Sequence, residues 1–190
     1  ATEPPSFEDL FPFHPNLMQQ AVIRATAATS GPTLMLIEAP TGVGKTEAAL
    51  YLADLWSQRE QLRGLYVAMP TMATSNQMFG RITEALHKRY GADSSTPLLV
   101  HSQARWMPDN APPTIISDDE RSGASAHAMA WFLPRKRSLL APFGVGTVDQ
   151  VLLAVLYSKH QSLRLLGLFR KVLVIDEVHA CDPYMLRVLE

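Results

Sequence analysis

The sequence predicts an α/β fold in which a doubly wound, mostly parallel sheet carries helices on both faces. Three observations point to this fold. Short apolar runs alternate with helical patterns along the chain. A glycine-rich loop at 39–46 joins the first apolar run to a long helical pattern. The last apolar run ends in the carboxylate pair Asp176-Glu177, and 190 residues suffice for one domain with its own core.

The expected elements follow from periodicity and turn residues. Strands are expected near 33–38, 65–69, 98–101, 138–142 and 172–176, because these runs are apolar and bounded by turn signals. Helices are expected near 17–29, 45–59, 75–90 and 148–158. The helix at 75–90 has an apolar face made of Met78, Phe79, Ile82 and Leu86. Residues 106–125 are polar and contain prolines, which predicts an exposed loop or insertion.

Composition excludes several classes of protein. The net charge of −1 gives no global basic signature, so any nucleic-acid contact must come from local groups and the backbone. The single Cys181 excludes an intrachain disulfide and favours a reducing compartment. The first ten residues lack a signal-peptide pattern, and the apolar run from Val151 to Tyr157 is too short to span a bilayer. We therefore expect a cytoplasmic protein with no membrane partner.

Residues 39–46, Ala-Pro-Thr-Gly-Val-Gly-Lys-Thr, match a phosphate-binding loop and are typical of P-loop NTPases. The first position is Ala39 where the pattern has glycine, and alanine is small enough for the turn. Lys45 is expected to reach the β- and γ-phosphates of ATP, and the Thr46 hydroxyl to bind Mg²⁺. The alternative is an ordinary glycine turn before a helix. The expected nucleotide-binding residues are Pro40, Thr41, Gly42, Val43, Gly44, Lys45 and Thr46.

The carboxylate pair is expected to complete a nucleotide-hydrolysing site. Asp176 follows a strand that is apolar enough to be central, at the end where open α/β sheets bind ligands. We expect Asp176 to hold Mg²⁺ through water and Glu177 to act as general base on the attacking water. His179 is expected to relay the nucleotide state, or else to be merely packed. The alternative for the pair is a solvated helix start, although Asp182-Pro183 offers a better one.

Other polar segments are candidates for binding. Gln19 is expected to read the adenine edge with its amide, or to be a polar residue on an amphipathic helix. Segments 69–77 and 144–150 each place hydroxyls and backbone N–H groups at a helix start, which suits a phosphate or simple capping. The basic run 135–137 is either a nucleic-acid contact or a solvated charge cluster.

The order of these motifs resembles the first RecA-like lobe of a superfamily 2 helicase. Beyond the loop, MPTMATSNQMFGRI, WFLPRKRSLLAPFGVGTVDQVLLA and VLVIDEVHACDPYM resemble the helicase portion of the CRISPR-associated helicase–nuclease of type I systems. The resemblance covers nearly the whole chain. It implies an N-terminal strap with an adenine-reading segment at 1–29, and a RecA-like ATPase lobe at 30–190 that is truncated after the DEVH motif.

The resemblance also implies an activity and partners. The family protein is an ATP-dependent translocase on single-stranded DNA, recruited by a crRNA-guided effector complex. It pairs this lobe with a second RecA-like lobe and an HD-type nuclease domain. By resemblance Lys45, Thr46, Asp176 and Glu177 carry the ATP–Mg²⁺ chemistry. The segments that contact the DNA strand contain Thr71, Thr74, Thr147 and Gln150.

Some family parts are absent from this sequence. No histidine is followed by aspartate, so an HD metal motif is missing, and no Ser-Ala-Thr motif or second lobe follows the carboxylate pair. We therefore expect the chain alone to bind nucleotide weakly and hydrolyse it very slowly, because arginine fingers come from a second lobe. Two alternatives stay open. One is a lobe of an RNA-acting DExH-type helicase, and the other is a nucleotide-binding interaction module without motor activity.

Overall fold

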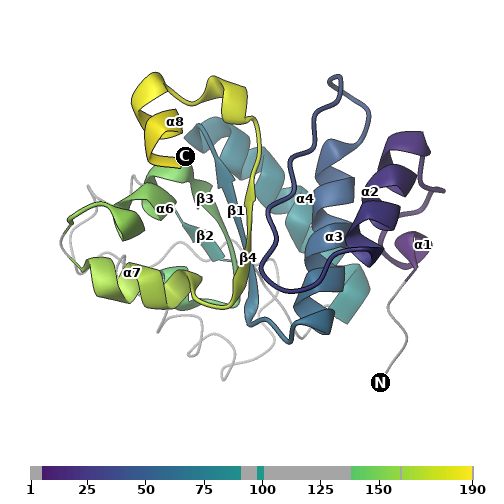
Figure 1. Cartoon of the computed structure of the whole chain (residues 1–190), viewed down its shortest axis with the longest axis horizontal. Helices are drawn as coiled ribbons and strands as arrows, with labels where there is room; N and C mark the ends of the chain where they lie inside the picture. Colours follow the sequence, from purple (N-terminus) through teal and green to yellow (C-terminus); the bar gives the residue numbers. More distant parts are fainter. Residues whose placement is uncertain (1–5, 91–97, 101–137, 159, 190) are drawn as a thin grey trace, which may run out of the picture.

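A computed structural model describes residues 6–90, 98–100, 138–158 and 160–189. One sheet lies between two layers of helices (Figure 1). Within the described residues the sheet has four parallel strands in the order β2-β3-β1-β4. They are β1 (Gly64–Met69), β2 (Leu98–Val100), β3 (Phe143–Thr147) and β4 (Lys171–Ile175). The predicted parallel sheet with helices on both faces is confirmed.

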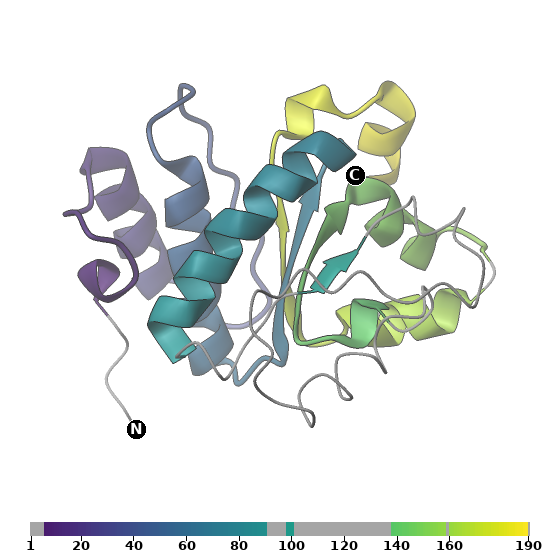
Figure 2. The ribbon, with the colours of Figure 1, turned by 180° about the vertical axis from the view of Figure 1, so that it is seen from behind.

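The helices divide between the two faces of the sheet. The first layer contains α1 (Phe7–Leu10), α2 (Leu17–Ala27), α3 (Lys45–Arg59) and α4 (Met72–Tyr90). Figure 2 shows α4 lying across this face. The second layer contains α6 (Val148–Val155), α7 (Gln161–Leu168) and α8 (Pro183–Leu189), with the short 3-10 turns η2 (Ser138–Leu140) and η3 (Val178–Ala180). In the described part of the chain, no helix is long and apolar enough to cross a membrane.

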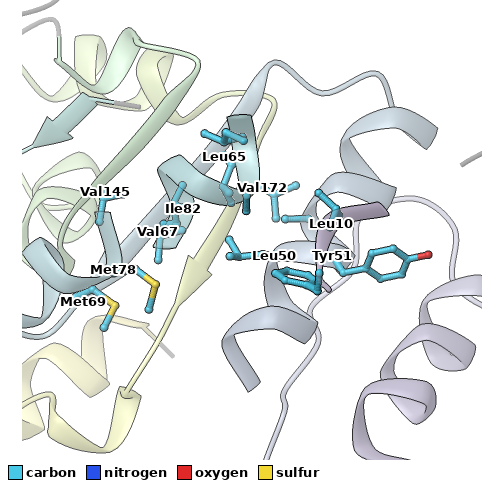
Figure 3. Packing of buried hydrophobic residues seen from close by; sticks show 14 of the residues in the cluster. Leu10, Leu50, Tyr51, Leu65, Val67, Met69, Met78, Ile82, Val145 and Val172 are labelled. Atoms are coloured by element: carbon cyan, nitrogen blue, oxygen red, sulfur yellow. The ribbon is translucent and has the colours of Figure 1, made fainter. Parts of the chain in front are cut away.

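Strand β1 is the centre of the core because both of its faces are buried. Leu65, Val67 and Met69 point to the α3–α4 layer, where Figure 3 shows Leu50, Met78 and Ile82 around them. Tyr66 and Ala68 point the other way and pack with α6. This alternation follows from the two-residue period of a strand. Each fully buried side chain of this size contributes roughly 1.5–3 kcal/mol.

The four predicted helices occur close to their expected positions, as α2, α3, α4 and α6, because their signals are local. Helix α3 begins directly after Gly44, which adopts the left-handed conformation that a glycine tolerates (φ 79°). Helix α4 buries Met78, Ile82 and Leu86 on the predicted face. At the start of α8, the Asp182 carboxylate accepts a hydrogen bond from the backbone N–H of Met185 at 2.9 Å. Asp182-Pro183 is therefore the helix start that the sequence suggested.

The prediction of a strand at 33–38 is wrong for this structure. The segment is not part of the sheet, although it keeps a strand-like alternation. Met35 and Ile37 pack against α2 and α3, whereas Leu34 and Leu36 are 96% and 84% exposed. A strand exists only where a neighbour supplies a backbone ladder, and β4 pairs in the described residues with β1 alone. Periodicity predicts the side-chain pattern but not the neighbour.

The strand expected at 138–142 is also wrong, because the strand begins at Phe143 and η2 precedes it. Gly144 and Gly146 lower the strand propensity of residues 143–147, a composition that is more typical of a loop. In the structure they pair in register with Tyr66 and Ala68 of β1, so glycine lies beside a fully buried tyrosine. The sequence did not predict α7. The predicted loop at 106–125, the basic run 135–137 and the last residue of the strand expected at 98–101 lie outside the described residues.

Lys171 ties β4 to the segment that precedes β3. Its ammonium donates hydrogen bonds to the backbone carbonyls of Leu139, at 2.6 Å, and Ala141. Burial disfavours the charged form and lowers the pKa of Lys171 to about 8. A lysine thus satisfies two carbonyls at the edge of the core at the cost of desolvating its charge.

Replacing Lys171 with methionine is expected to change how stability depends on pH. Between the folded pKa of about 8 and the ordinary value of 10.5, the unfolded chain holds a proton that the folded chain has released. Raising the pH through this window therefore stabilises the unmodified protein relative to Lys171→Met. Denaturant unfolding of both proteins at about pH 7 and about pH 10 measures the change.

Lys88→Met, which removes an exposed lysine of α4, is the control for general charge effects. A stability difference between Lys171→Met and the unmodified protein that stays constant over this pH range would contradict the assignment.

Candidate functional site

The carboxyl ends of β1, β3 and β4 meet at one edge of the sheet. Met69 pairs with Thr147 and Ala68 pairs with Ile175 in the parallel register. The backbone N–H of Asp176 donates to the Ala68 carbonyl at 3.1 Å and extends the ladder by one step. The motifs that follow these three strands therefore gather on the side where open α/β sheets bind ligands.

One hydrogen bond joins the phosphate-loop motif to the carboxylate pair. The Thr46 hydroxyl donates to Oδ2 of Asp176 at 3.1 Å, across 130 residues of sequence. The other oxygen, Oδ1, accepts from the backbone N–H of Glu177 at 2.9 Å. Two bonds thus fix the orientation of the Asp176 carboxylate. The structure brings Thr46 and Asp176 together, as two predicted ligands of one ion require.

The Thr46–Asp176 pair has the donor chemistry that Mg²⁺ prefers. Both atoms are oxygens, one from a hydroxyl and one from a carboxylate. Mg²⁺ commonly uses one or two protein ligands and keeps several waters. The residues present therefore fit the ion.

The phosphate loop places Lys45 over the turn at the start of α3. Gly42 and Gly44 both have φ 79°, so the turn uses a backbone conformation that favours glycine. The Lys45 ammonium donates to the carbonyls of Ala39, at 2.7 Å, and Pro40, at 3.1 Å. A cation and the free N–H groups of a helix start thus meet at one place, which suits an anionic ligand.

Gln19 lies against the phosphate loop, where its amide makes hydrogen bonds within the chain. It is only 2% exposed; its Nε2 donates to the Gly44 carbonyl at 3.1 Å, and its Oε1 accepts from the Asn16 N–H at 2.9 Å. Asn16 donates in turn to the Val43 carbonyl at 3.0 Å. Two amides therefore hold the loop to the start of α2. Sequence reasoning missed Asn16, although the Asn-x-x-Gln spacing is the signal of a capping box.

Glu177 and His179 form a pair just beyond Asp176. Oε2 of Glu177 lies 3.2 Å from Nε2 of His179, and the histidine is 76% exposed. Glu177 itself adopts a left-handed backbone conformation with φ 53°. Such a conformation costs a residue with a side chain about 1–3 kcal/mol and is common at functional sites. Glu177 lies between the end of β4 and the η3 turn, at the carboxyl end of the strand.

Thr71 and Thr74 cap helix α4. The two hydroxyls are 2.9 Å apart, and Thr71 Oγ1 accepts from the Thr74 backbone N–H at 3.3 Å. Ser75 is fully buried and donates its hydroxyl to the Thr71 carbonyl at 2.8 Å. This geometry agrees with the capping alternative for the segment. Thr71 is exposed, so the same cap presents its hydroxyl at the sheet edge.

Thr147 and Gln150 lie at the start of α6. The Thr147 hydroxyl is buried and has no hydrogen-bond partner among the described residues. Oε1 of Gln150 accepts a hydrogen bond from the Arg164 guanidinium of α7 at 2.8 Å. Burial lowers the pKa of Arg164. Sequence reasoning missed Arg164, because no local pattern links α7 to α6.

Comparison with known proteins places this site in a family. A family model described as the type III restriction enzyme, res subunit, matches residues 12–183. The chain belongs to this family. It is 45% identical over 193 residues to the CRISPR-associated endonuclease/helicase Cas3 of Thermus thermophilus, covering 97% of this chain and 21% of that protein. It is 40% identical to the Cas3 nuclease/helicase of Streptococcus thermophilus and 35% identical to Cas3 of Escherichia coli, covering 96% and 90% of this chain and 20% of each relative.

Solved structures agree with this assignment. The crystal structure of T. fusca Cas3 with AMPPNP superposes with a TM-score of 0.79 at 44% identity, over 98% of this chain and 20% of that one. The ADP form of the same protein gives 0.77. The chain therefore spans about a fifth of the length of the relatives it matches. Its expected resemblance to the helicase portion of the CRISPR-associated helicase–nuclease, with a RecA-like fold, is confirmed.

Gly44→Ala is expected to destabilise the protein more than Gly42→Ala. Both positions have φ 79°, so both alanines carry about 1–2 kcal/mol of left-handed strain. At Gly44 the new Cβ would also lie 2.4 Å from Nε2 of Gln19, whereas at Gly42 it would meet nothing within 4 Å. Denaturant unfolding of the two variants measures the difference.

Removing the Gln19 side chain in the Gly44→Ala background tests the cause. We expect Gln19→Ala to be less destabilising there than in the unmodified protein, because it relieves the clash. Equal unfolding free energies for Gly42→Ala and Gly44→Ala would contradict the proposed contact between Gln19 and the loop.

Proposed function

We propose that residues 30–190 are the first ATP-binding lobe of an ATP-dependent single-stranded DNA translocase acting in type I CRISPR interference. Residues 1–29 form its strap and adenine-side segment. The observation that carries this proposal is the bond between Thr46 and Asp176, which unites the two motifs of the nucleotide site. The 35–45% identity to Cas3 helicase/nucleases over nearly the whole chain supports it.

The nucleotide side of the site uses a cation, a hydroxyl and a carboxylate. When bound, Mg²⁺ neutralises charge on the phosphate oxygens of ATP. Thr46 and Asp176 would hold the ion, with Asp176 acting through water. Lys45 exchanges its bonds to the Ala39 and Pro40 carbonyls for phosphate oxygens, and the loop from Pro40 to Gly44 presents its backbone to the same phosphates.

Glu177 is the residue that we assign to the attacking water. Its Oε2 faces Nε2 of His179, which leaves Oε1 to accept a proton from water. The partnership with His179 orients the carboxylate and links it to the exposed surface beside the strand ends. A change at the nucleotide can then reach His179 through this one side-chain contact.

Gln19 connects the adenine side to the loop. Its Nε2 has a second hydrogen that the Gly44 bond does not use. We propose that adenine engages this amide while Asn16 holds Oε1 in place; because the Gln19 side chain is only 2% exposed, this contact requires a shift of the neighbouring backbone. Adenine recognition and loop conformation are thereby coupled through one side chain.

The strand-binding side lies on neighbouring helix starts at the same sheet edge. Thr71 and Thr74 begin α4, and Thr147 and Gln150 begin α6, after strands that pair in register at Met69 and Thr147. Hydroxyls and backbone N–H groups grip a phosphate backbone without reading bases, which suits movement along DNA. The proposed partners are single-stranded DNA, a second RecA-like lobe, an HD nuclease domain and a crRNA-guided effector complex. The proposed setting is the cytoplasm.

The decisive test is ATP turnover by this lobe, alone and mixed with the second lobe of its protein. Each preparation is assayed with single-stranded DNA, single-stranded RNA or no strand. We expect substantial turnover only in the mixture and only with DNA, because an arginine finger from a second lobe contributes about 10³–10⁵ in rate in related NTPases. Lys45→Ala is the control and should abolish turnover while leaving nucleotide-free DNA binding in place.

Other outcomes separate the competing functions. RNA-selective turnover would favour the alternative that the protein is a lobe of an RNA-acting helicase. An absence of turnover in every combination, with both lobes folded and associated, would favour a nucleotide-binding module without motor activity. Fast turnover by the isolated lobe would contradict the requirement for a second lobe.

A further inference from the structure

Two ion pairs connect helix α3 to helix α4. Glu47 of α3 pairs through Oε1 with the guanidinium of Arg81 of α4. Asp54 of α3 pairs with Arg89 of α4 at 3.1 Å. The partners are separated by seven residues on α3 and eight on α4, which is about two turns on each helix. The helices therefore run in the same direction with their N-termini at the same edge of the sheet.

Glu47 lies directly after the Thr46 that binds Asp176. Its side chain is 20% exposed, and its second oxygen, Oε2, is buried with no hydrogen-bond partner among the described residues. A buried polar atom without a partner costs about 1–3 kcal/mol, and more when the group is charged. Among the described residues, Arg81 is the cation that pairs with the Glu47 carboxylate and offsets the cost of burying it. The position of the first turn of α3 therefore depends on a residue of α4.

Arg81 is joined to the strand-binding side by the helix that carries it. It follows Thr74 by seven residues on α4, which corresponds to about 10 Å along the helix axis. Thr71 and Thr74 form the cap of that same helix. A bound strand that displaced the cap would also displace Arg81, because both lie on one continuous helix.

We propose that the Glu47–Arg81 ion pair is a positioning contact that couples strand binding at the start of α4 to the nucleotide site at Thr46. This inference rests on the proposed function. Neither residue touches nucleotide or strand; each acts through its neighbour, Glu47 through Thr46 and Arg81 through the α4 cap. Because coupling is reciprocal, nucleotide binding also biases the position of the α4 cap.

The position of this pair distinguishes it from the other ion pairs of the two helices. Asp54–Arg89 lies about two turns further from the sheet edge, so it fixes the distance between the helices without reaching either site. Glu84–Lys88 lies within α4 and is more exposed. Glu47–Arg81 alone among these three is one residue from a predicted Mg²⁺ ligand. It is therefore the pair through which a displacement of α4 reaches the nucleotide.

The test measures strand stimulation in the full-length protein that contains this lobe. Stimulation is the ratio of ATP turnover with saturating single-stranded DNA to turnover without DNA. Glu47→Gln and Arg81→Gln should each lower this ratio about fivefold or more, the lower range of typical coupling between sites. The double variant should lose no more than either single variant, because the contact is removed once. Glu84→Gln with Lys88→Gln is the matched control and should keep the ratio.

Each outcome bears on the proposal. Unchanged ratios in the single variants, losses that multiply in the double variant, or an equal loss in the control would overturn it. If a glutamine variant does not unfold cooperatively, Glu47→Asp keeps the charge and shortens the side chain by one methylene. It should lower the ratio while the protein stays folded, and an unchanged ratio would overturn the proposal. An unmodified protein that no strand stimulates would overturn the proposed function, and this coupling with it.

Discussion

The hydrogen bond from Thr46 to Asp176 depends on every layer of the structure. Asp176 reaches this position because the parallel register continues past Ile175, where its N–H bonds to the Ala68 carbonyl. Thr46 reaches it because two left-handed glycines turn the chain into α3, and α3 packs on β1 through Leu50. An error of one residue in the register would turn the side chain of Asp176 to the other face. The buried alternation of β1 therefore sets the geometry of the site.

Several residues around this bond have strained backbone or unpaired buried polar atoms, and the apolar core offsets the free-energy cost of these features. Glu177 has a left-handed backbone, Glu47 has a buried oxygen without a described partner, and the Thr147 hydroxyl is likewise unpaired. Each feature costs on the order of 1–3 kcal/mol. All three lie near the carboxyl ends of the strands, whereas β1 below them is apolar and fully buried. This division is the one expected when a rigid apolar scaffold holds polar groups in positions that they would not adopt alone.

The sequence predicted the parts of the fold that have local causes. The phosphate loop, α3 and the apolar face of α4 follow from turn residues and helical periodicity, and the structure has them close to the expected bounds. The strand at 33–38 and the start of β3 failed because pairing depends on a distant neighbour. Sequence periodicity cannot show that Gly144 lies beside Tyr66. The same limit applies to the site: the motifs predicted Thr46 and Asp176, which the structure brings together, but the bonds of Asn16 and Arg81 to distant partners have no local signal.

These distant contacts give a physical basis for the proposal that one loop responds to two ligands. On one side the amides of Asn16 and Gln19 hold the carbonyls of Val43 and Gly44. On the other side Glu47 fixes the first turn of α3 to α4 through Arg81. The phosphate loop that these contacts hold has two glycines in the left-handed conformation, so its shape depends on the contacts that support it. If a nucleotide engages Gln19 and a strand engages the α4 cap, as we propose, both act on the same short stretch of backbone. In this arrangement, communication between the two ligands requires only small displacements of packed helices, which a close-packed core transmits without rearranging.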